Sequence, residues 1–166
     1  MKTFFITLLI VLGFSLKSDN ELEKKEIESS INQWHQAAAE ANFDNYFNLM
    51  TDDAIFIGTD ASENWNKKEF KAYSKPHFDK GKAWTFHTLE RNIYVGKSNK
   101  IAWFDELLDT SFKICRGSGV LEKVKGKWKI KHYVLSMTIP NETANEVVAV
   151  KNSIESNFIH RLKSKK

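Results

Sequence analysis

The stretch that decides the fold is residues 101–139, which read IAWFDELLDTSFKICRGSGVLEKVKGKWKIKHYVLSMTI. Apolar and polar residues alternate through most of it, and a period of two residues is typical of β-strands. We expect three strands here, at residues 101–109, 112–124 and 128–139, with a tight hairpin at Lys125-Gly126 between the last two. Residues 84–95 have the same period, so the sequence predicts a meander of four long antiparallel strands.

The residues that precede this meander predict helices and one short strand. Apolar residues spaced three and four apart predict a long first helix, which begins near Ser18 and continues to Ala41. The same spacing predicts a short second helix at residues 43–50. Residues 54–58 are a short apolar run that we expect to form a strand, and residues 59–65 read as a polar loop.

A third helix is expected after this loop, and a fourth after the sheet. Asn66 can cap the third helix with Glu69 at the reciprocal position, and Pro76 ends it or lies just beyond its end. Residues 147–158 predict a C-terminal helix. Helices followed by long antiparallel strands give an α+β fold, in which a strongly curved sheet wraps around the long N-terminal helix. Such a cone has a pocket at its open end.

The two ends of the 166-residue chain differ from its body. Lys2 followed by an apolar run to Leu16 is typical of a signal peptide, so we expect export to the periplasm or outside the cell, with cleavage near Ser18. The sequence then divides into a signal peptide at 1–18, one domain at 19–140, and a C-terminal helix with a basic tail at 141–166. No stable membrane association is expected after cleavage.

The composition excludes several classes of function. The formal net charge of +4 comes from the two ends, and the body is slightly acidic, which argues against a nucleic-acid-binding surface. Cys115 is the only cysteine, so no intramolecular disulfide can form, and we expect a small buried side chain rather than a catalytic thiol. No Cys/His cluster, metal-binding motif or phosphate-binding glycine loop occurs, so we expect neither a metal nor a cofactor.

Several motifs occur in an order that resembles the SnoaL-like group of the nuclear-transport-factor-2-like (NTF2-like) superfamily, over residues 22–140. The matching pieces are Ile57-Gly58-Thr59-Asp60, Trp65, Glu69-Phe70, Trp103-Phe104-Asp105-Glu106, the run from Arg116 to Leu121, and the run from Trp128 to Ser136. The resemblance implies a curved sheet, a pocket, and often a dimer formed through the outer face of the sheet. It does not imply one activity, because the superfamily includes ketosteroid isomerases, polyketide cyclases, epoxide hydrolases, dehydratases and non-catalytic domains.

Asp105 and Arg116 are the first candidate site residues. Each shares a strand face with apolar residues, so we expect both charges to be buried, and a buried charge needs a partner. An ion pair between them could simply shape the cone, or its guanidinium could also bind a ligand carboxylate. His132 shares a face with Trp128 and Ile130, which favours either a hydrogen-bonded core histidine or a general base.

Aromatic side chains are the second group of candidates. The chain has 12 Phe, 5 Trp and 4 Tyr. Five aromatic residues could line an apolar pocket, namely Trp34, Tyr46, Trp65, Tyr73 and Trp103, and we expect Trp34, Tyr46 and Trp103 to contact a ligand there. His35 and His77 flank the apolar stripes, so we expect them on the solvent side.

These observations leave three hypotheses for function. The first is a secreted, dimeric, non-enzymatic domain that binds a small apolar or carboxylate-bearing ligand through Asp105, Arg116 and His132. The second is a lyase, isomerase or hydrolase that uses Asp105 or His132 as a base in the same pocket. The third is an interaction module in which the cone is only a scaffold.

Overall fold

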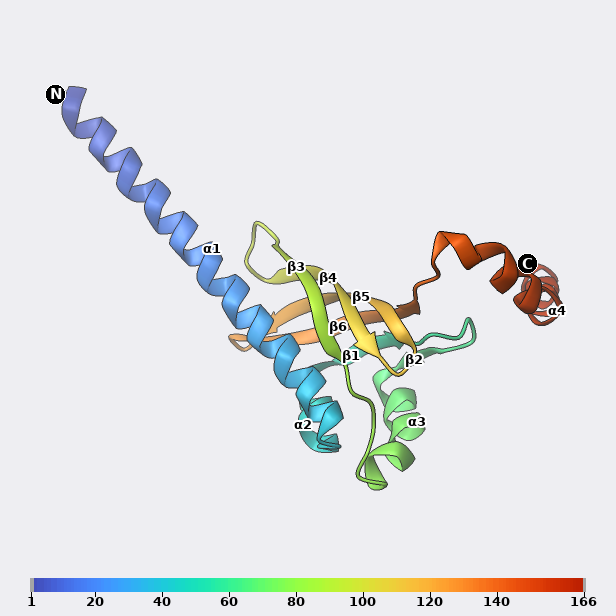
Figure 1. Ribbon diagram of the computed structural model, residues 1–166. Helices are drawn as coiled ribbons and strands as arrows, with labels where there is room; N and C mark the ends of the chain where they lie inside the picture. The colour runs from blue at the N-terminus through green and yellow to red at the C-terminus, as the bar shows by residue number, and fades with distance from the viewer. Residues whose placement is uncertain (1, 166) are drawn as a thin grey trace.

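The computed structural model describes residues 2–165, with side chains from residue 20 onward. Four α-helices, six strands and one 3-10 turn are present in this part of the chain (Figure 1). In chain order they are α1 (Lys2–Ala39), α2 (Phe43–Asn48), β1 (Met50–Ile57), β2 (Asn64–Asn66), α3 (Lys67–Asp79), β3 (His87–Val95), β4 (Ile101–Thr110), β5 (Lys113–Val124), β6 (Lys127–Met137), η1 (Asn141–Thr143) and α4 (Ala144–Lys163).

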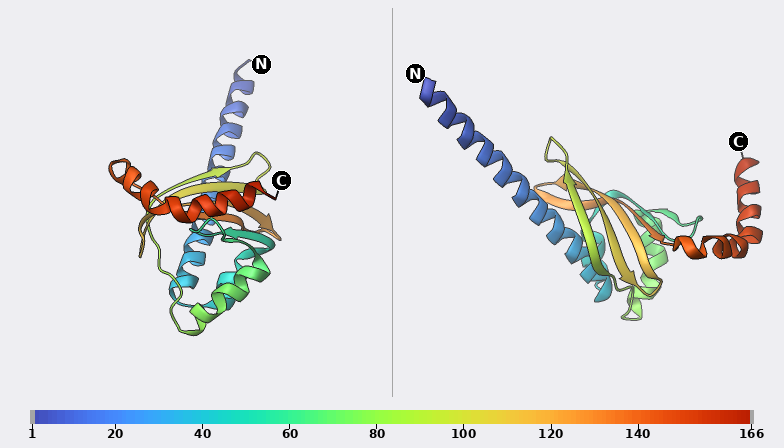
Figure 2. Two further views of the ribbon diagram at one scale, coloured as in Figure 1. Left: turned by 90° about the vertical axis from the view of Figure 1, so that its right-hand side faces the viewer. Right: turned by 45° about the horizontal axis from the view of Figure 1, so that its top comes forward.

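The strands form one curved sheet in the order β2-β1-β6-β5-β4-β3. Strands β3 to β6 make the predicted antiparallel meander, while β1 joins it through a parallel pairing with β6. Helices α1, α2 and α3 all lie on one side of the sheet, and the other side is open (Figures 1 and 2). The predicted α+β cone is therefore confirmed, with an inner face covered by helices and an outer face left exposed.

Local sequence rules explain most of the element boundaries. The capping box at the start of α3 is present, because Asn66 Oδ1 accepts from the Glu69 N–H and the Glu69 carboxylate accepts from the Asn66 N–H. Lys125 and Gly126 both have positive φ, at 50° and 78°, as the predicted hairpin requires. Pro76 was expected to end the third helix or to lie just beyond its end, and this was wrong, because Pro76 lies inside α3, which continues to Asp79.

The beginning of the chain differs from the predicted pattern. Helix α1 runs from Lys2, so the expected helix start near Ser18 was wrong. The predicted signal peptide at residues 1–18 lies outside the described side chains. From residue 20 onward, no helix combines the length and hydropathy that a bilayer-spanning segment needs.

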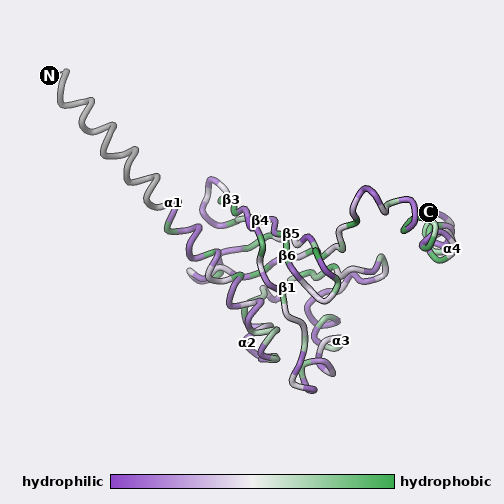
Figure 3. Tube along the Cα trace, viewed as in Figure 1, coloured by the Kyte–Doolittle hydropathy of each residue, from purple (hydrophilic) through white to green (hydrophobic). Residues whose placement is uncertain are grey.

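The inner face of the sheet forms the core together with the apolar stripe of α1. Hydrophobic and hydrophilic positions alternate along the strands (Figure 3). The buried positions of β4 are Ala102, Phe104, Glu106 and Leu108, and those of β5 are Cys115, Gly117, Gly119 and Leu121. Cys115 is buried, as expected.

This set of buried positions reverses the predicted orientation of two strands. Asp105 and Arg116 were expected to point inward, but both alternate with the buried residues and lie on the outer face. The prediction failed because Trp103, Leu107, Ile114 and Val120 make the outer positions look apolar, whereas the inner positions of β5 include two glycines. Alternation identifies two faces, and it does not by itself say which one is buried.

His132 is displaced from the inner face by a β-bulge. Val120 pairs with His132 while the next residue, Leu121, pairs with Ile130, so Lys131 is an extra residue in β6. Ile130 and Tyr133 are therefore both buried, and His132 lies on the outer face. The predicted shared face of His132 and Ile130 was wrong because a bulge reverses the alternation beyond it.

Helix α4 extends from the end of β6 and contributes no buried residue. It projects away from the cone at the side opposite α1 (Figures 1 and 2). Its apolar side chains are largely exposed, for example Val150 at 76% and Ile154 at 73%. The predicted C-terminal helix is thus present, and it does not pack into the core.

Candidate functional site

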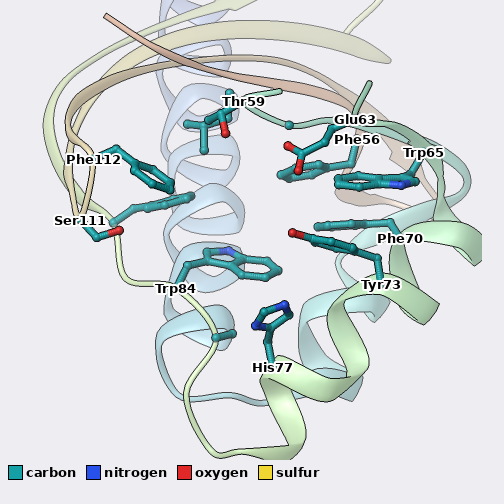
Figure 4. A pocket seen from close by; sticks show the side chains of 14 residues that line it. Phe56, Thr59, Glu63, Trp65, Phe70, Tyr73, His77, Trp84, Ser111 and Phe112 are labelled. Atoms are coloured by element: carbon teal, nitrogen blue, oxygen red, sulfur yellow. The ribbon is translucent and has the colours of Figure 1, made fainter. Parts of the chain in front are cut away.

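A pocket of about 240 Å³ opens at the end of the cone, between α3, the segment that leads into β3, and the ends of β1, β5 and β6. Figure 4 shows the rings that surround it. Fourteen residues line it, namely Phe56, Gly58, Thr59, Glu63, Trp65, Phe70, Tyr73, His77, Ala83, Trp84, Phe86, Ser111, Phe112 and Leu135. Ligand pockets are usually apolar clefts with a few polar groups, and this one has that character.

Stacked rings form one wall of the pocket. The Phe70 ring lies 4.0 Å from that of Phe56, with an angle of 13° between their planes, and 5.8 Å from that of Trp84 at 27°. Trp65 stacks on Tyr73 at 4.3 Å. Flat aromatic rings in this arrangement favour a flat or apolar ligand, because ring stacking adds to the free energy gained when apolar surface is buried.

Glu63 is the only acidic side chain in the pocket lining, and among the described residues no Lys or Arg lines it. In Figure 4 the Glu63 carboxylate and the Tyr73 hydroxyl point toward the same open space. Glu63 Oε2 accepts a hydrogen bond from the Asp60 N–H at 3.1 Å. Burial raises the pKa of Tyr73, and the negative charge of Glu63 raises it further. The Glu63 charge therefore reaches into the pocket.

A second polar group lies deeper, inside the core. Glu106 on β4 is fully buried, and its Oε1 lies 2.9 Å from His35 Nε2 and accepts from the Tyr133 hydroxyl at 2.9 Å. Its Oε2 accepts from Arg91 Nε at 2.9 Å and from the Arg91 Nη2 at 2.7 Å. Arg91 also donates to Asn32 on α1 at 2.6 Å, so this cluster ties the first helix to the sheet.

The charge of Glu106 is stabilised by these partners. Burial alone would raise its pKa, but the hydrogen bond of His35 and the charge of Arg91 outweigh that effect and hold the pKa below its ordinary value. Burial raises the pKa of Tyr133 well above its ordinary value, and the Glu106 charge adds to this effect. Glu106 is thus an ionised carboxylate with its hydrogen bonds satisfied, and Tyr133 is a neutral donor.

One layer of side chains separates this cluster from the pocket. Phe56 lines the pocket and its ring lies 5.6 Å from that of Tyr133, while Phe86 lines the pocket and lies 5.5 Å from the ring of His35. His35, Arg91, Glu106 and Tyr133 are absent from the lining, and their side chains are almost completely buried. The cluster packs behind the residues that line the pocket, and it does not face the pocket itself.

The residues predicted to form the site lie outside this pocket. Asp105 accepts a hydrogen bond from Asn92 at 3.1 Å on the outer face, where its neighbour across the sheet is Ser118. Arg116 is exposed and lies opposite Leu107, and no ion pair joins it to Asp105 among the described residues. His132 lies on the same face, and Trp103 is 47% exposed and stacks on Tyr94.

Trp34 and Tyr46 are in the core rather than in the pocket lining. Their rings stack at 5.0 Å, and both side chains are about 1% exposed. Within the described part of the chain, Trp34 Nε1 and the Tyr46 hydroxyl have no hydrogen-bond partner. The Trp84 ring lies edge-on to Tyr46, 5.6 Å away, and links this core to the pocket wall.

Sequence patterns did not identify the polar groups that the fold brings together. Glu63 belongs to a segment that reads as an ordinary polar loop, and its place in the pocket depends on β1 pairing with β2. His35 was expected on the solvent side, but it is buried against Glu106. Tyr73 and Trp65 were expected to line an apolar pocket, and both line this one. His77 was expected on the solvent side and lines the pocket too; its spacing of four residues from Tyr73 on one helix was the available signal. No group of three metal-ligating side chains occurs within the described residues.

Solved structures with the same fold carry different names. An NTF2-like protein of unknown function from Pseudomonas putida KT2440 is 16% identical, with a TM-score of 0.59 over 72% of this chain and 89% of that one. A protein from Streptomyces avermitilis, provisionally named a dehydratase of the NTF2-like family, is 8% identical, with a TM-score of 0.64 over 73% and 99% of the two chains. At these identities the similarity shows the fold alone.

A protein from Nostoc punctiforme, described as a domain of unknown function with a cystatin-like fold, covers more of the chain. It is 16% identical, with a TM-score of 0.61 over 86% of this chain and 98% of that one. A comparison with curated proteins finds no match. The family model of the SnoaL-like domain matches residues 27–140, which is well over half of the chain. The chain therefore belongs to the SnoaL-like domain family, with the NTF2-like fold that its sheet and helices describe.

Proposed function

We propose that this protein binds a small, largely apolar ligand in the pocket at the open end of the cone. The observation that carries the proposal is the lining itself, in which aromatic rings surround a space of about 240 Å³ and leave one half-buried carboxylate facing it. Pockets for drug-sized ligands have volumes of about 300–1,000 Å³. The ligand is therefore smaller than those molecules.

The lining argues against the carboxylate-bearing ligand that was one of the initial alternatives. That alternative depended on Arg116, which lies on the outer face. Glu63 would repel a carboxylate in the pocket, and like charges in a partly dry site cost more than they do in water. An apolar body with a hydrogen-bond donor or a positive charge fits the lining better.

Binding rather than catalysis is the proposal that the geometry supports best. The bases considered from the sequence, Asp105 and His132, are not in the pocket lining. Glu106 has an environment that could tune a catalytic group, but its two oxygens are occupied by four hydrogen bonds and a layer of rings covers it. The provisional dehydratase name of the Streptomyces avermitilis protein keeps an enzyme as the alternative.

Indole resonances offer a direct test of ligand binding. Trp65 and Trp84 line the pocket, whereas Trp103 lies on the outer face and serves as an internal control. Titration of the ¹⁵N-labelled protein with toluene or benzyl alcohol should shift the indole N–H signals of Trp65 and Trp84 and leave that of Trp103 in place. Shifts at Trp103 alone, or at none of the three, would reject the proposal.

A substitution at the pocket mouth gives the second readout. Phe112 lines the pocket and is 54% exposed, so Phe112→Ala should fold normally and weaken toluene binding about tenfold, since apolar contact area is lost. Ile114→Ala is the matched control, because Ile114 is similarly exposed, at 47%, and does not line the pocket.

We also propose that two copies of the chain associate through the outer face of the sheet. Large apolar side chains are exposed there, including Tyr94, Trp103 and Ile114. An exposed apolar patch of this kind is typical of an association surface. Trp103→Glu should convert the dimer to a monomer in light scattering. Val150→Glu on α4 should leave it dimeric, and the opposite pair of results would place the interface on α4.

Export remains a prediction from residues 1–18. The mass of the mature protein tests it, because cleavage removes about 18 residues.

A further inference from the structure

The charge and the rings of the pocket define the chemistry of its ligand more closely. Glu63 is half-buried, its carboxylate faces the open space, and the rest of the lining is dominated by aromatic rings. An ionised carboxylate that a bound ligand shields from water needs a partner, because loss of hydration is costly. Among the described lining residues no Lys or Arg supplies that partner, which leaves the carboxylate open to a positively charged ligand.

Only one oxygen of this carboxylate has a partner within the described part of the chain. Oε2 accepts from the Asp60 N–H. The same oxygen is close to Gly58, where an added Cβ would lie 3.0 Å from the carboxyl carbon of Glu63. The glycine, which directly follows β1, therefore leaves room for the carboxylate to sit against the backbone and point toward the pocket. The second oxygen is available to a ligand.

The surrounding rings favour a cation over a neutral hydrogen-bond donor. The faces of Trp and Tyr rings carry negative potential and attract cations, and cages of such rings recognise quaternary ammonium groups. Trp65, Tyr73 and Trp84 line the pocket beside Glu63. A neutral hydroxyl could bond to the carboxylate but would gain nothing from the rings. An ammonium group with apolar substituents would satisfy both.

We propose that the pocket recognises a small organic cation, with a substituted ammonium group held between Glu63 and the rings of Tyr73 and Trp84. This inference rests on the proposed ligand-binding function and specifies its ligand class. His77 lines the same pocket and approaches the ring of Tyr73, with 5.7 Å between their centroids.

Three probes of one shape separate charge from size. Choline, 3,3-dimethylbutan-1-ol and 3,3-dimethylbutanoate present a cation, a neutral group and an anion on similar branched skeletons. We expect choline to bind roughly tenfold more tightly than the alcohol, and the anion to bind most weakly. Affinities follow from the shifts of the Trp65 and Trp84 indole signals, with Trp103 as the internal reference.

Glu63→Gln removes the charge and keeps an oxygen that can accept from the Asp60 N–H, so the loop should retain its structure. The variant should lose the preference for choline and bind the alcohol as the parent protein does. Glu28→Gln, at an exposed position on α1 outside the pocket lining, should keep the full preference.

The outcomes distinguish this inference from the function on which it rests. If the alcohol binds as tightly as choline, or if Glu63→Gln retains the preference, the cation is rejected while toluene binding still supports the pocket. If neither toluene nor any of the three probes shifts the pocket indoles, both proposals fail together.

Discussion

Neighbouring residues on β4 hold their negative charges in contrasting ways on the two faces of the sheet. Glu106, on the inner face, is fully buried and accepts hydrogen bonds from three side chains, two of which come from outside β4 and its neighbour β3. Asp105, on the outer face, accepts one hydrogen bond from Asn92 near solvent. The comparison teaches that burial and partners, rather than the residue type, determine how much a charge contributes to stability.

The largest expected effect tests this difference directly. Glu106→Ala leaves Arg91 buried without its carboxylate, and we expect the free energy of unfolding to fall by about 3–5 kcal/mol. Asp105→Ala, one residue away, should change it by less than about 0.5 kcal/mol, since the site is near the surface. Urea unfolding of both variants measures the two free energies of unfolding. If the alanine variant at Glu106 does not fold, Glu106→Gln is measured in its place. Equal losses for the two positions would contradict the comparison.

A substitution at Gly117, on the inner face of β5, should have the next largest effect on stability. A Cβ at Gly117 would overlap the Tyr133 hydroxyl and lie 2.8 Å from Glu106 Oε1, so the cluster needs a residue without a side chain here. Gly117→Ala should lower the free energy of unfolding by about 1–3 kcal/mol, as overpacking does. Ser118→Ala, the adjacent exposed position, is the control and should have little effect. A neutral Gly117→Ala would mean that the cluster is not closely packed against β5.

The pH dependence of stability has the smallest expected effect and is the test most specific for Glu106. The pKa of Glu106 is lower in the folded protein than its ordinary value of about 4.3, so the folded state binds a proton less readily than the unfolded state. This carboxylate contributes its full stabilisation above the unfolded pKa and loses it as the pH falls through the folded pKa. The size of the loss grows with the difference between the folded and unfolded pKa values.

The matched variant isolates this contribution. Between pH 7 and pH 3 the parent protein should lose stability more steeply than Glu106→Gln, with the difference confined to the region below about pH 4.3. Glu23 and Asp53 also have lowered pKa values, but they are present in both proteins, so their effects cancel. Parallel curves for the two proteins would show that Glu106 does not contribute in this way.

Periodicity and caps allowed the architecture to be predicted from the sequence. The alternation over residues 84–139 predicted the meander, and Asn66 with Glu69 predicted the start of α3. These features are local, because a strand period, a cap or a positive-φ hairpin depends on residues a few positions apart. The order of the motifs was sufficient to predict the family.

The candidate site depended on contacts that no local pattern contains. The glycines of β5 and the bulge at Lys131 decide which strand face is buried, and both faces carry apolar residues, so the alternation was consistent with either orientation. Glu106 meets His35 across 71 residues, and Glu63 enters the pocket only through the pairing of β1 with β2. The sequence by itself determined the elements and their order, whereas only the tertiary structure decided which charges face the core, the pocket or solvent, because that choice depends on long-range packing.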